Sequence, residues 1–271
     1  MSRTARCAAL LLVGALAVPF AALADSSITA AGSTALLPLM KAAAEAYQAK
    51  NPSVKIAVSG GGSGTGINEV AQKAVDLGDS DILATNHPEL VDHRVAVIGF
   101  AIVTHPGVNV TNLSKKQLQD IFGGKTQNWK EVGGADVKIT VINRPRNSGT
   151  RAVFTKTVMG DVPLSAAGLT EDATGSVVAT VKNTPGSISY AAFSGTHGQG
   201  LTELSIDGVA PTDENIIAGK YPVWSYEHVY TNGQPSADVS RFLAFVTSNS
   251  DLLHKAGYIL IRDMKTTESD R

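Results

Sequence analysis

The chain has 271 residues, of which 43% are hydrophobic and 17% are charged, and its formal net charge at pH 7 is −1. A chain of this length and apolar content can bury a core that needs neither disulfides nor a structural metal. The near-neutral charge excludes the basic stripe that nucleic-acid-binding proteins require, so no nucleic-acid partner is expected.

The first 24 residues have the three parts of a secretory signal peptide. Arg3 and Arg6 give a positive n-region, an apolar run follows, and Ala22-Leu23-Ala24 is a small-x-small cleavage site. Cleavage before Asp25 would lower the formal charge from −1 to −3, because both arginines leave with the signal. We therefore predict a signal peptide at 1–24 and a soluble mature chain that is exported to the periplasm.

Cysteine and histidine usage limits the chemistry open to the mature chain. Cys7 is the only cysteine and lies in the predicted n-region, which argues against a lipid anchor and leaves the mature chain without thiols. No two histidines have the spacing of a helical metal site. We interpret the histidines as surface or capping residues and expect no metal and no cofactor. They are His87, His93, His105, His197, His228 and His254.

Strand-like and helix-like stretches alternate from residue 27 onward, which predicts an α/β fold with mainly parallel strands. The first predicted elements are a strand at 27–31, a helix at 34–50, a strand at 54–58, a helix from about 66, and strands at 75–82 and 95–103. The pattern restarts after residue 106 with a helix at 114–122, a strand at 137–142, helices at 149–159 and 174–182, an extended segment at 187–190, a helix at 211–218, a strand at 223–230, and helices at 236–248 and 251–257.

Two long extended stretches, 95–105 and 221–231, bracket the middle of the chain. They are the natural places for the chain to leave one lobe and return to it. Two lobes joined by two crossovers form a hinge around a cleft, and α/β proteins bind ligands at the carboxyl ends of their strands. We predict one lobe from 25–102 plus 227–271 and a second lobe from 103–226.

Three segments share one design, in which a strand ends in a small, hydroxyl-rich turn and a helix follows at once. They are AGST at 31–34, GGGSGTG at 60–66 and RPRNSGT at 144–150. Each would offer free backbone N–H groups, a hydroxyl and the positive end of a helix dipole to a ligand. Taken singly, each segment is explained by an ordinary helix cap or glycine turn. Taken together, and with Arg144 and Asp81 in the same pattern, they favour an oxyanion site.

Enzyme motifs are incomplete in this chain. Gly123-Gly124-Lys125-Thr126 is preceded by Gln119 where a P-loop needs glycine, and no G-x-G-x-x-G register exists among the glycines at 60–66. Thr65 stands where the nucleophile motif G-x-S-x-G, centred on Ser63, needs its second glycine. We therefore predict a binding protein and not an enzyme.

The mature chain resembles, over essentially its whole length, the substrate-binding component of the ABC-type phosphate transporter, the PstS family. The matching stretches, in order, are ITAAGST at 28–34, SGGGSGTGINEV at 59–70, VDLGDSDI at 75–82, LSKKQLQDIFGGKTQNWKEVGG at 113–134, RPRNSGTRAVF at 144–154 and KYPVWSYEHVYTNG at 220–233. The resemblance implies a type II periplasmic-binding-protein fold with a two-stranded hinge. It also implies that the protein captures inorganic phosphate by hinge closure and delivers it, as a monomer, to the membrane permease of an ABC transporter.

Carried over position by position, the resemblance implies a phosphate site made of hydroxyls, backbone amides, one carboxylate and one guanidinium. Its members are Thr34, Ala35, Ser63, Asp81, Arg144, Ser148, Gly149 and Thr150. Arg146 and Asn147 depart from the Asp-Gly that is common in the family, so the acidic residue that usually orients the ligand arginine is absent locally. The alternatives left open are another oxyanion, such as sulfate, molybdate or an organophosphate, and a periplasmic phosphohydrolase or signalling protein on the same fold.

Overall fold

The computed structural model describes residues 26–268, and the predicted signal peptide at 1–24 lies outside this range. Within it, ten strands form a single sheet with the order β2-β1-β3-β10-β4-β8-β6-β7, while β9 pairs with β4 and β5 pairs with β9. No helix in the described part of the chain is long and apolar enough to cross a membrane.

The strands are short except where they connect the two ends of the molecule. They are β1 (Ser26–Gly32), β2 (Val54–Gly60), β3 (Leu77–Ser80), β4 (Leu90–Thr104), β5 (Asn112–Leu113), β6 (Thr140–Asn143), β7 (Leu169–Thr170), β8 (Ser187–Ala192), β9 (Thr202–Ile206) and β10 (Trp224–Asn232). The α-helices are α1 (Leu37–Lys50), α2 (Ser63–Ala71), α3 (Lys115–Phe122), α4 (Gly149–Phe154), α5 (Thr174–Asn183), α6 (Phe193–Thr196), α7 (Asp213–Ile217), α8 (Ala237–Ser248) and α9 (Ser250–Lys255).

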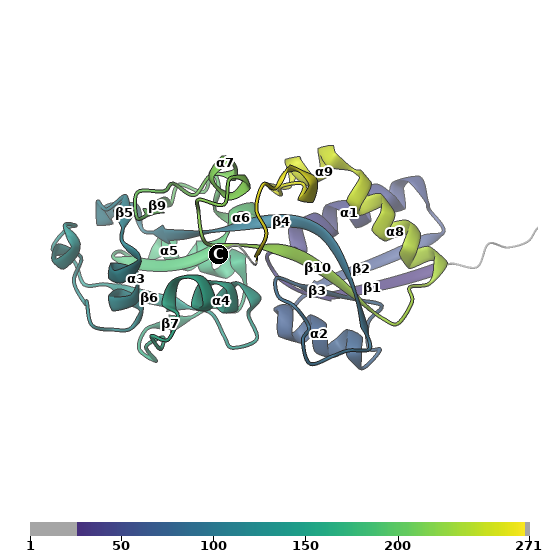
Figure 1. The fold of residues 1–271 in the computed structure, drawn as a ribbon, viewed down its shortest axis with the longest axis horizontal. Coiled ribbons are helices and arrows are strands. Elements are labelled where there is room, and N and C mark those ends of the chain that lie inside the picture. Colours follow the sequence, from purple (N-terminus) through teal and green to yellow (C-terminus); the bar gives the residue numbers. More distant parts are fainter. Residues whose placement is uncertain (1–25, 269–271) are drawn as a thin grey trace, which may run out of the picture.

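The strands β4 and β10 run between two groups of elements (Figure 1). One group holds β1, β2, β3, α1, α2, α8 and α9, and the other holds β5 to β9 and α3 to α7. β4 changes partner along its length, pairing with β10 over Leu90–Gly99 and with β8 over Phe100–Thr104. The sheet is therefore continuous, and the change of partner on β4 marks the boundary between the groups.

The expected α/β architecture is confirmed, and within residues 26–268 the sheet is mixed, with five parallel strand pairs and four antiparallel ones. The pairs β1–β2, β1–β3, β5–β9, β6–β7 and β6–β8 are parallel, whereas β3–β10, β4–β10, β4–β8 and β4–β9 are antiparallel. The antiparallel pairs all involve β4 or β10, because these two crossing strands run through the molecule in opposite directions and lie side by side at its centre.

An aromatic cluster fixes α4 against the sheet below the loop that carries Arg144. The rings of Phe154 and Tyr190 are stacked with centroids 4.2 Å apart, and Phe122 lies 4.7 Å from Phe154. The Tyr190 hydroxyl donates a 3.4 Å hydrogen bond to the Asn143 side chain, at the end of β6. Stacked and tilted aromatic pairs of this kind hold both position and orientation, so α4 and the end of β6 are placed together.

Two helices begin three residues away from their predicted starts. α2 begins at Ser63 and not near residue 66, because Gly62 supplies a backbone turn with φ of 90° directly before it. α1 begins at Leu37 and not at Thr34, because residues 34–36 form a turn whose amides bond to the Ser33 hydroxyl. Both differences change which atoms face the ends of the strands.

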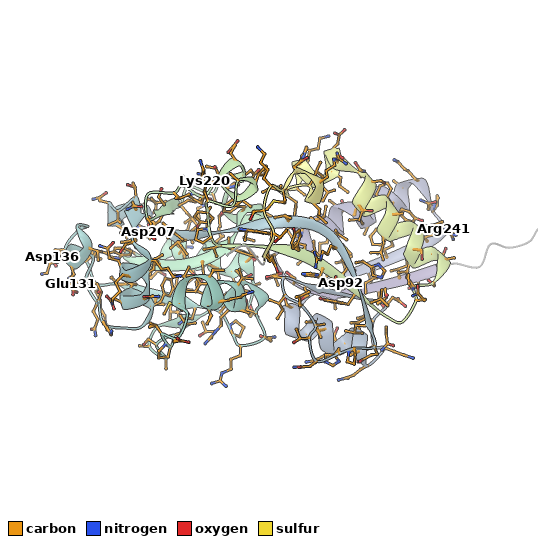
Figure 2. The ribbon with its side chains drawn as sticks, viewed as in Figure 1. Asp92, Glu131, Asp136, Asp207, Lys220 and Arg241 are labelled. Atoms are coloured by element: carbon orange, nitrogen blue, oxygen red, sulfur yellow. The ribbon has the colours of Figure 1, made fainter. Side chains whose placement is uncertain are left out.

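The interpretation of every histidine as a surface or capping residue is wrong for His228. This residue is only 1% exposed on β10, and its Nδ1 lies 2.8 Å from an oxygen of Asp92, which Figure 2 labels. A buried strand position flanked by two neighbours offered no spacing signal in the sequence. His105 does act as a cap, accepting a hydrogen bond from the Gly107 amide.

Candidate functional site

The end of β3 brings one carboxylate between the two groups of elements. Asp81 follows β3 directly and is 2% exposed. Its oxygens accept hydrogen bonds from the hydroxyls of Ser33, after β1, and of Thr150, in α4, the latter at 2.9 Å. Its backbone N–H donates to the Ser63 hydroxyl at 2.9 Å. A single acidic residue therefore gathers three hydroxyls from three separate segments.

Arg144 lies on the other side of the same space and is 1% exposed. Its Nε donates to the carbonyl of Glu171 at 2.9 Å, and its Nη2 donates to the carbonyl of Asp172 at 2.9 Å and to Thr34 Oγ1 at 3.2 Å. Among residues 26–268 its Nη1 has no hydrogen-bond partner. The two carbonyls orient the guanidinium, which is the role that the absent local carboxylate would have had.

The predicted helix starts approach each other closely. The Ser148 hydroxyl caps α4 by accepting from the Arg151 amide at 3.2 Å. Gly149 and Thr150 follow in the first turn of α4, where backbone amides have no acceptor within the helix. Gly149 lies so near Ser63 that a Cβ on it would fall 2.2 Å from Ser63 Oγ. The first turns of α4 and α2 thus meet, one from each group of elements.

Ala35 contributes to the site indirectly, whereas the sequence predicted that its amide contacts the ligand. Ala35 is fully buried, and its amide donates to the Ser33 hydroxyl at 3.0 Å. Its carbonyl accepts hydrogen bonds from the hydroxyls of Tyr258 and Ser194. The other seven predicted residues lie together around the contact between the two groups of elements, whereas Ala35 supports the turn behind Thr34.

Sequence reasoning missed Ser33 and Thr174. Ser33 bonds to Asp81, and Thr174 donates its amide to Thr34 Oγ1 at 3.2 Å from the start of α5. A signal was available for Thr174, because ATGS at 173–176 repeats the small, hydroxyl-rich helix start of the other three segments. The signal for Ser33 is its place in AGST at 31–34, one residue before Thr34.

Burial sets the electrostatics of the site. The pKa of Asp81 is raised above its usual value chiefly by burial, and hydrogen bonds from Ser33 and Thr150 and the charge of Arg144 oppose this rise. The pKa of Arg144 is lowered by the same loss of solvent, while Asp81 acts to raise it. Both charges therefore lack water, and an anion that approached the guanidinium would be attracted with little screening.

Two further carboxyl groups lie buried behind Asp81. Asp79 on β3 and Glu227 on β10 are both 0% exposed, and all four of their oxygens lack a hydrogen-bond partner within residues 26–268. Burial raises the pKa of each well above its usual value, and the charge of Asp81 raises both further. Two unpaired carboxylates cannot be buried at low cost, so burial favours the neutral, protonated form of both groups.

We expect this pair to make the ligand-free fold less stable as pH rises. An acid whose pKa is higher in the folded state binds more protons there, so its contribution to stability is present below the usual pKa near 4 and declines above it. Asp79→Asn and Glu227→Gln should each flatten this decline. Urea unfolding at pH 5 and pH 8 measures it, and the difference between wild type and variant cancels surface acids such as Asp120, whose pKa is lowered by Lys116. Parallel pH profiles for wild type and both variants would contradict the assignment.

A model of the PBP superfamily domain matches residues 19–250. This match covers most of the chain, so the protein belongs to the PBP superfamily. Over 252 residues the chain is 44% identical to the phosphate-binding protein PstS of Bacillus subtilis strain 168, which covers 90% of this chain and 84% of that protein. Within the superfamily, the chain therefore belongs to the family of phosphate-binding proteins PstS.

Solved structures agree with this assignment. The fold matches a structure described as a phosphate ABC transporter substrate-binding protein with bound phosphate from Clostridium perfringens, with a TM-score of 0.82, 29% identity, and coverage of 87% of this chain and 100% of that one. It also matches an ABC-type phosphate transport receptor from Vibrio cholerae, with a TM-score of 0.70, 28% identity, and coverage of 86% and 99%. The predicted periplasmic-binding-protein fold is confirmed by these matches.

Proposed function

We propose that the protein captures inorganic phosphate between its two groups of elements and does not transform it. One observation carries the proposal. Arg144 is a buried cation whose Nη1 has no partner in the described chain, and it lies among the hydroxyls and helix starts gathered by Asp81. A buried guanidinium nitrogen without an acceptor is costly unless a ligand supplies one. The family of the chain makes phosphate that ligand.

The proposed site takes donors from both groups of elements. Thr34 and Ser63 come from the group that holds β1 and α2, and Arg144 and the first turn of α4 come from the other. An anion bridging them would satisfy donors on both sides, so binding and closure would be one event. The two lobes remain as proposed, 25–102 plus 227–271 and 103–226, and the change of partner on β4 near Phe100 supports a hinge there.

Phosphate binding is tested first on mature protein freed of endogenous ligand by unfolding, dialysis and refolding. Phosphate at 100 times its Kd is expected to add about 2.7 kcal/mol of stability by mass action, because the site cannot exist in the unfolded chain. Differential scanning calorimetry should show a rise in Tm, and titration calorimetry should give the affinity. A Tm that stays flat at saturating phosphate would overturn the proposal.

Substitution of Gly149 is expected to weaken phosphate binding strongly. In Gly149→Ala the new methyl group would lie 2.2 Å from Ser63 Oγ and 2.9 Å from Asp81 Cβ, so the two lobes could not meet as they do. Overpacking of this kind costs about 1–3 kcal/mol. Gly175→Ala is the matched control, because it changes the first turn of α5, where nothing lies within 4 Å of the added carbon. Titration calorimetry should show a loss only for Gly149→Ala, and equal affinities would contradict this reading of the contact.

We further propose that the protein works in the periplasm as a monomer and delivers phosphate to the permease of an ABC transporter. The segment 113–134 is a candidate docking surface. It includes α3 and ends beyond Glu131, which Figure 2 labels at the end of the molecule farthest from α8. Co-purification of the permease with wild type, and its loss when Lys115 and Lys116 are replaced by glutamate, would support this role.

A further inference from the structure

Asn147 makes a contact between the lobes that no anion needs. It lies in the loop between Arg144 and α4, and its side-chain Nδ2 donates to the Gly61 carbonyl at 2.8 Å and to Thr65 Oγ1 at 3.1 Å. Its own carbonyl accepts from the Gly64 amide at 2.9 Å. Three hydrogen bonds thus join residue 147 to the glycine-rich loop on the opposite side of the cleft.

The glycine-rich loop is shaped to receive this residue. A Cβ on Gly62 would lie 2.9 Å from the Asn147 carbonyl oxygen, and a Cβ on Gly64 would lie 3.2 Å from Asn147 Cβ. Gly62 also has φ of 90°, a conformation that L-residues other than glycine rarely adopt. Two glycines of the loop therefore leave room for Asn147, independently of their place near the ligand.

The contact is exposed to solvent, unlike the residues of the proposed site. Asn147 is exposed, whereas its neighbour Ser148 and the ligand-facing Arg144 are buried. Asn147 Nδ2 has two protein acceptors, so it is not an unused donor waiting for an anion. Its bonds can form only when the two lobes meet, because they join residues 61–65 to residue 147.

We propose that Asn147 is a latch that holds the closed, loaded form of the protein and sets how long phosphate stays bound. This inference rests on the proposed capture of phosphate and adds a positioning residue outside the ligand's own contacts. A latch acts after the lobes close, so it should slow release of the anion and leave its arrival nearly unchanged. It would therefore tune the interval in which the loaded protein can reach its permease.

Dissociation of radiolabelled phosphate into excess unlabelled phosphate tests the proposal. Asn147→Ala removes both side-chain bonds, and Asn147→Gly also removes the packing against Gly64. Each variant is expected to raise the dissociation rate constant about 3- to 30-fold, as the loss of two partly exposed hydrogen bonds implies. Association rates should stay within about twofold of wild type. Ligand-free Tm values close to wild type will show that the fold is unaffected.

Arg146→Ala is the matched control in the same loop. Arg146 is exposed and has no hydrogen bond or ion pair among those seen in the described chain. Its removal should slow association, most strongly at low salt, and leave dissociation within about twofold of wild type. The two neighbouring variants should therefore affect opposite rate constants.

A double-mutant cycle with Gly64→Ala separates a latch from a general loss of fit. The added methyl carbon would lie 3.2 Å from Asn147 Cβ, so it should push residue 147 away from the loop. Alanine itself is favourable in the first turn of α2, so the helix should not be destabilised. Gly64→Ala should thus raise dissociation in wild type and raise it less in Asn147→Gly. Additive effects in the cycle, or unchanged dissociation in Asn147→Ala and Asn147→Gly, would overturn the latch. Failure of wild type to bind phosphate at all would instead overturn the proposed function beneath it.

Discussion

Arg144→Ala is expected to weaken phosphate binding by about 2–5 kcal/mol, the range for deleting one member of a buried charge pair. The alanine would remove the buried guanidinium of the proposed site and leave the carbonyls of Glu171 and Asp172 without these donors. Arg144→Lys should lose nearly as much, because one ammonium cannot reach both carbonyls, Thr34 and a ligand together. Titration calorimetry of both variants against wild type measures the effect.

The register of the loop is tested by the same measurement on Arg146→Ala. Arg146 is exposed and Arg144 is buried, so only the latter should be essential. Normal binding by Arg144→Ala together with failure of Arg146→Ala would show that the ligand arginine had been assigned two residues too early.

Asp81→Asn is expected to narrow the preference for phosphate over sulfate, which should be several kcal/mol in wild type. Near neutral pH phosphate carries at least one proton, so it can donate a hydrogen bond to the Asp81 carboxylate. Sulfate carries no proton and would place negatively charged oxygens against Asp81. The carboxylate already accepts from Ser33 and Thr150, and its remaining lone pairs can accept one more donor. The asparagine removes the negative charge that repels sulfate.

Titration of phosphate and sulfate into wild type and Asp81→Asn decides whether Asp81 selects phosphate over sulfate or only stabilises the turn that follows β3. Asp79→Asn is the matched control, because Asp79 lies in β3 two residues before Asp81 and its burial already favours the neutral form. It should leave the ratio of the two affinities unchanged. If Asp81→Asn also leaves the ratio unchanged, Asp81 is not part of the ligand site.

Local pattern predicted most elements of the fold because strands and helices alternate with clear periodicity. It misplaced the start of α2, because the positive φ of Gly62 lets this helix begin at Ser63 and a backbone angle cannot be seen in a pattern of residue types. It did not predict that β4 and β10 pair antiparallel with their neighbours, because several of those partners lie far away in the sequence. Two-residue strands such as β5 and β7 carry too few residues for any period to show.

Residue types predicted which side chains gather, but not how each is held. Local pattern predicted that the segments 31–34, 60–66 and 144–150 converge, and the resemblance to the PstS family pointed to Thr34, Ser63 and Arg144 within them. The hydrogen bonds from Arg144 to two main-chain carbonyls could not be predicted from residue types, since every residue has a carbonyl. The acid Glu227 was equally hidden, because only pairing of β3 with β10 brings it near Asp81.

The carbonyl support of Arg144 has a consequence for how the sequence can drift. Substitutions at Glu171 and Asp172 change side chains and leave the two oxygens that hold the guanidinium in place. The side chain of Glu171 accepts a hydrogen bond from Thr180, so its loss would loosen the segment without removing the acceptor. Only a proline, an insertion or a deletion that redirects the main chain between β7 and α5 would displace both oxygens. The orientation of the Arg144 side chain is thus set by the main-chain path, which most point mutations leave unchanged.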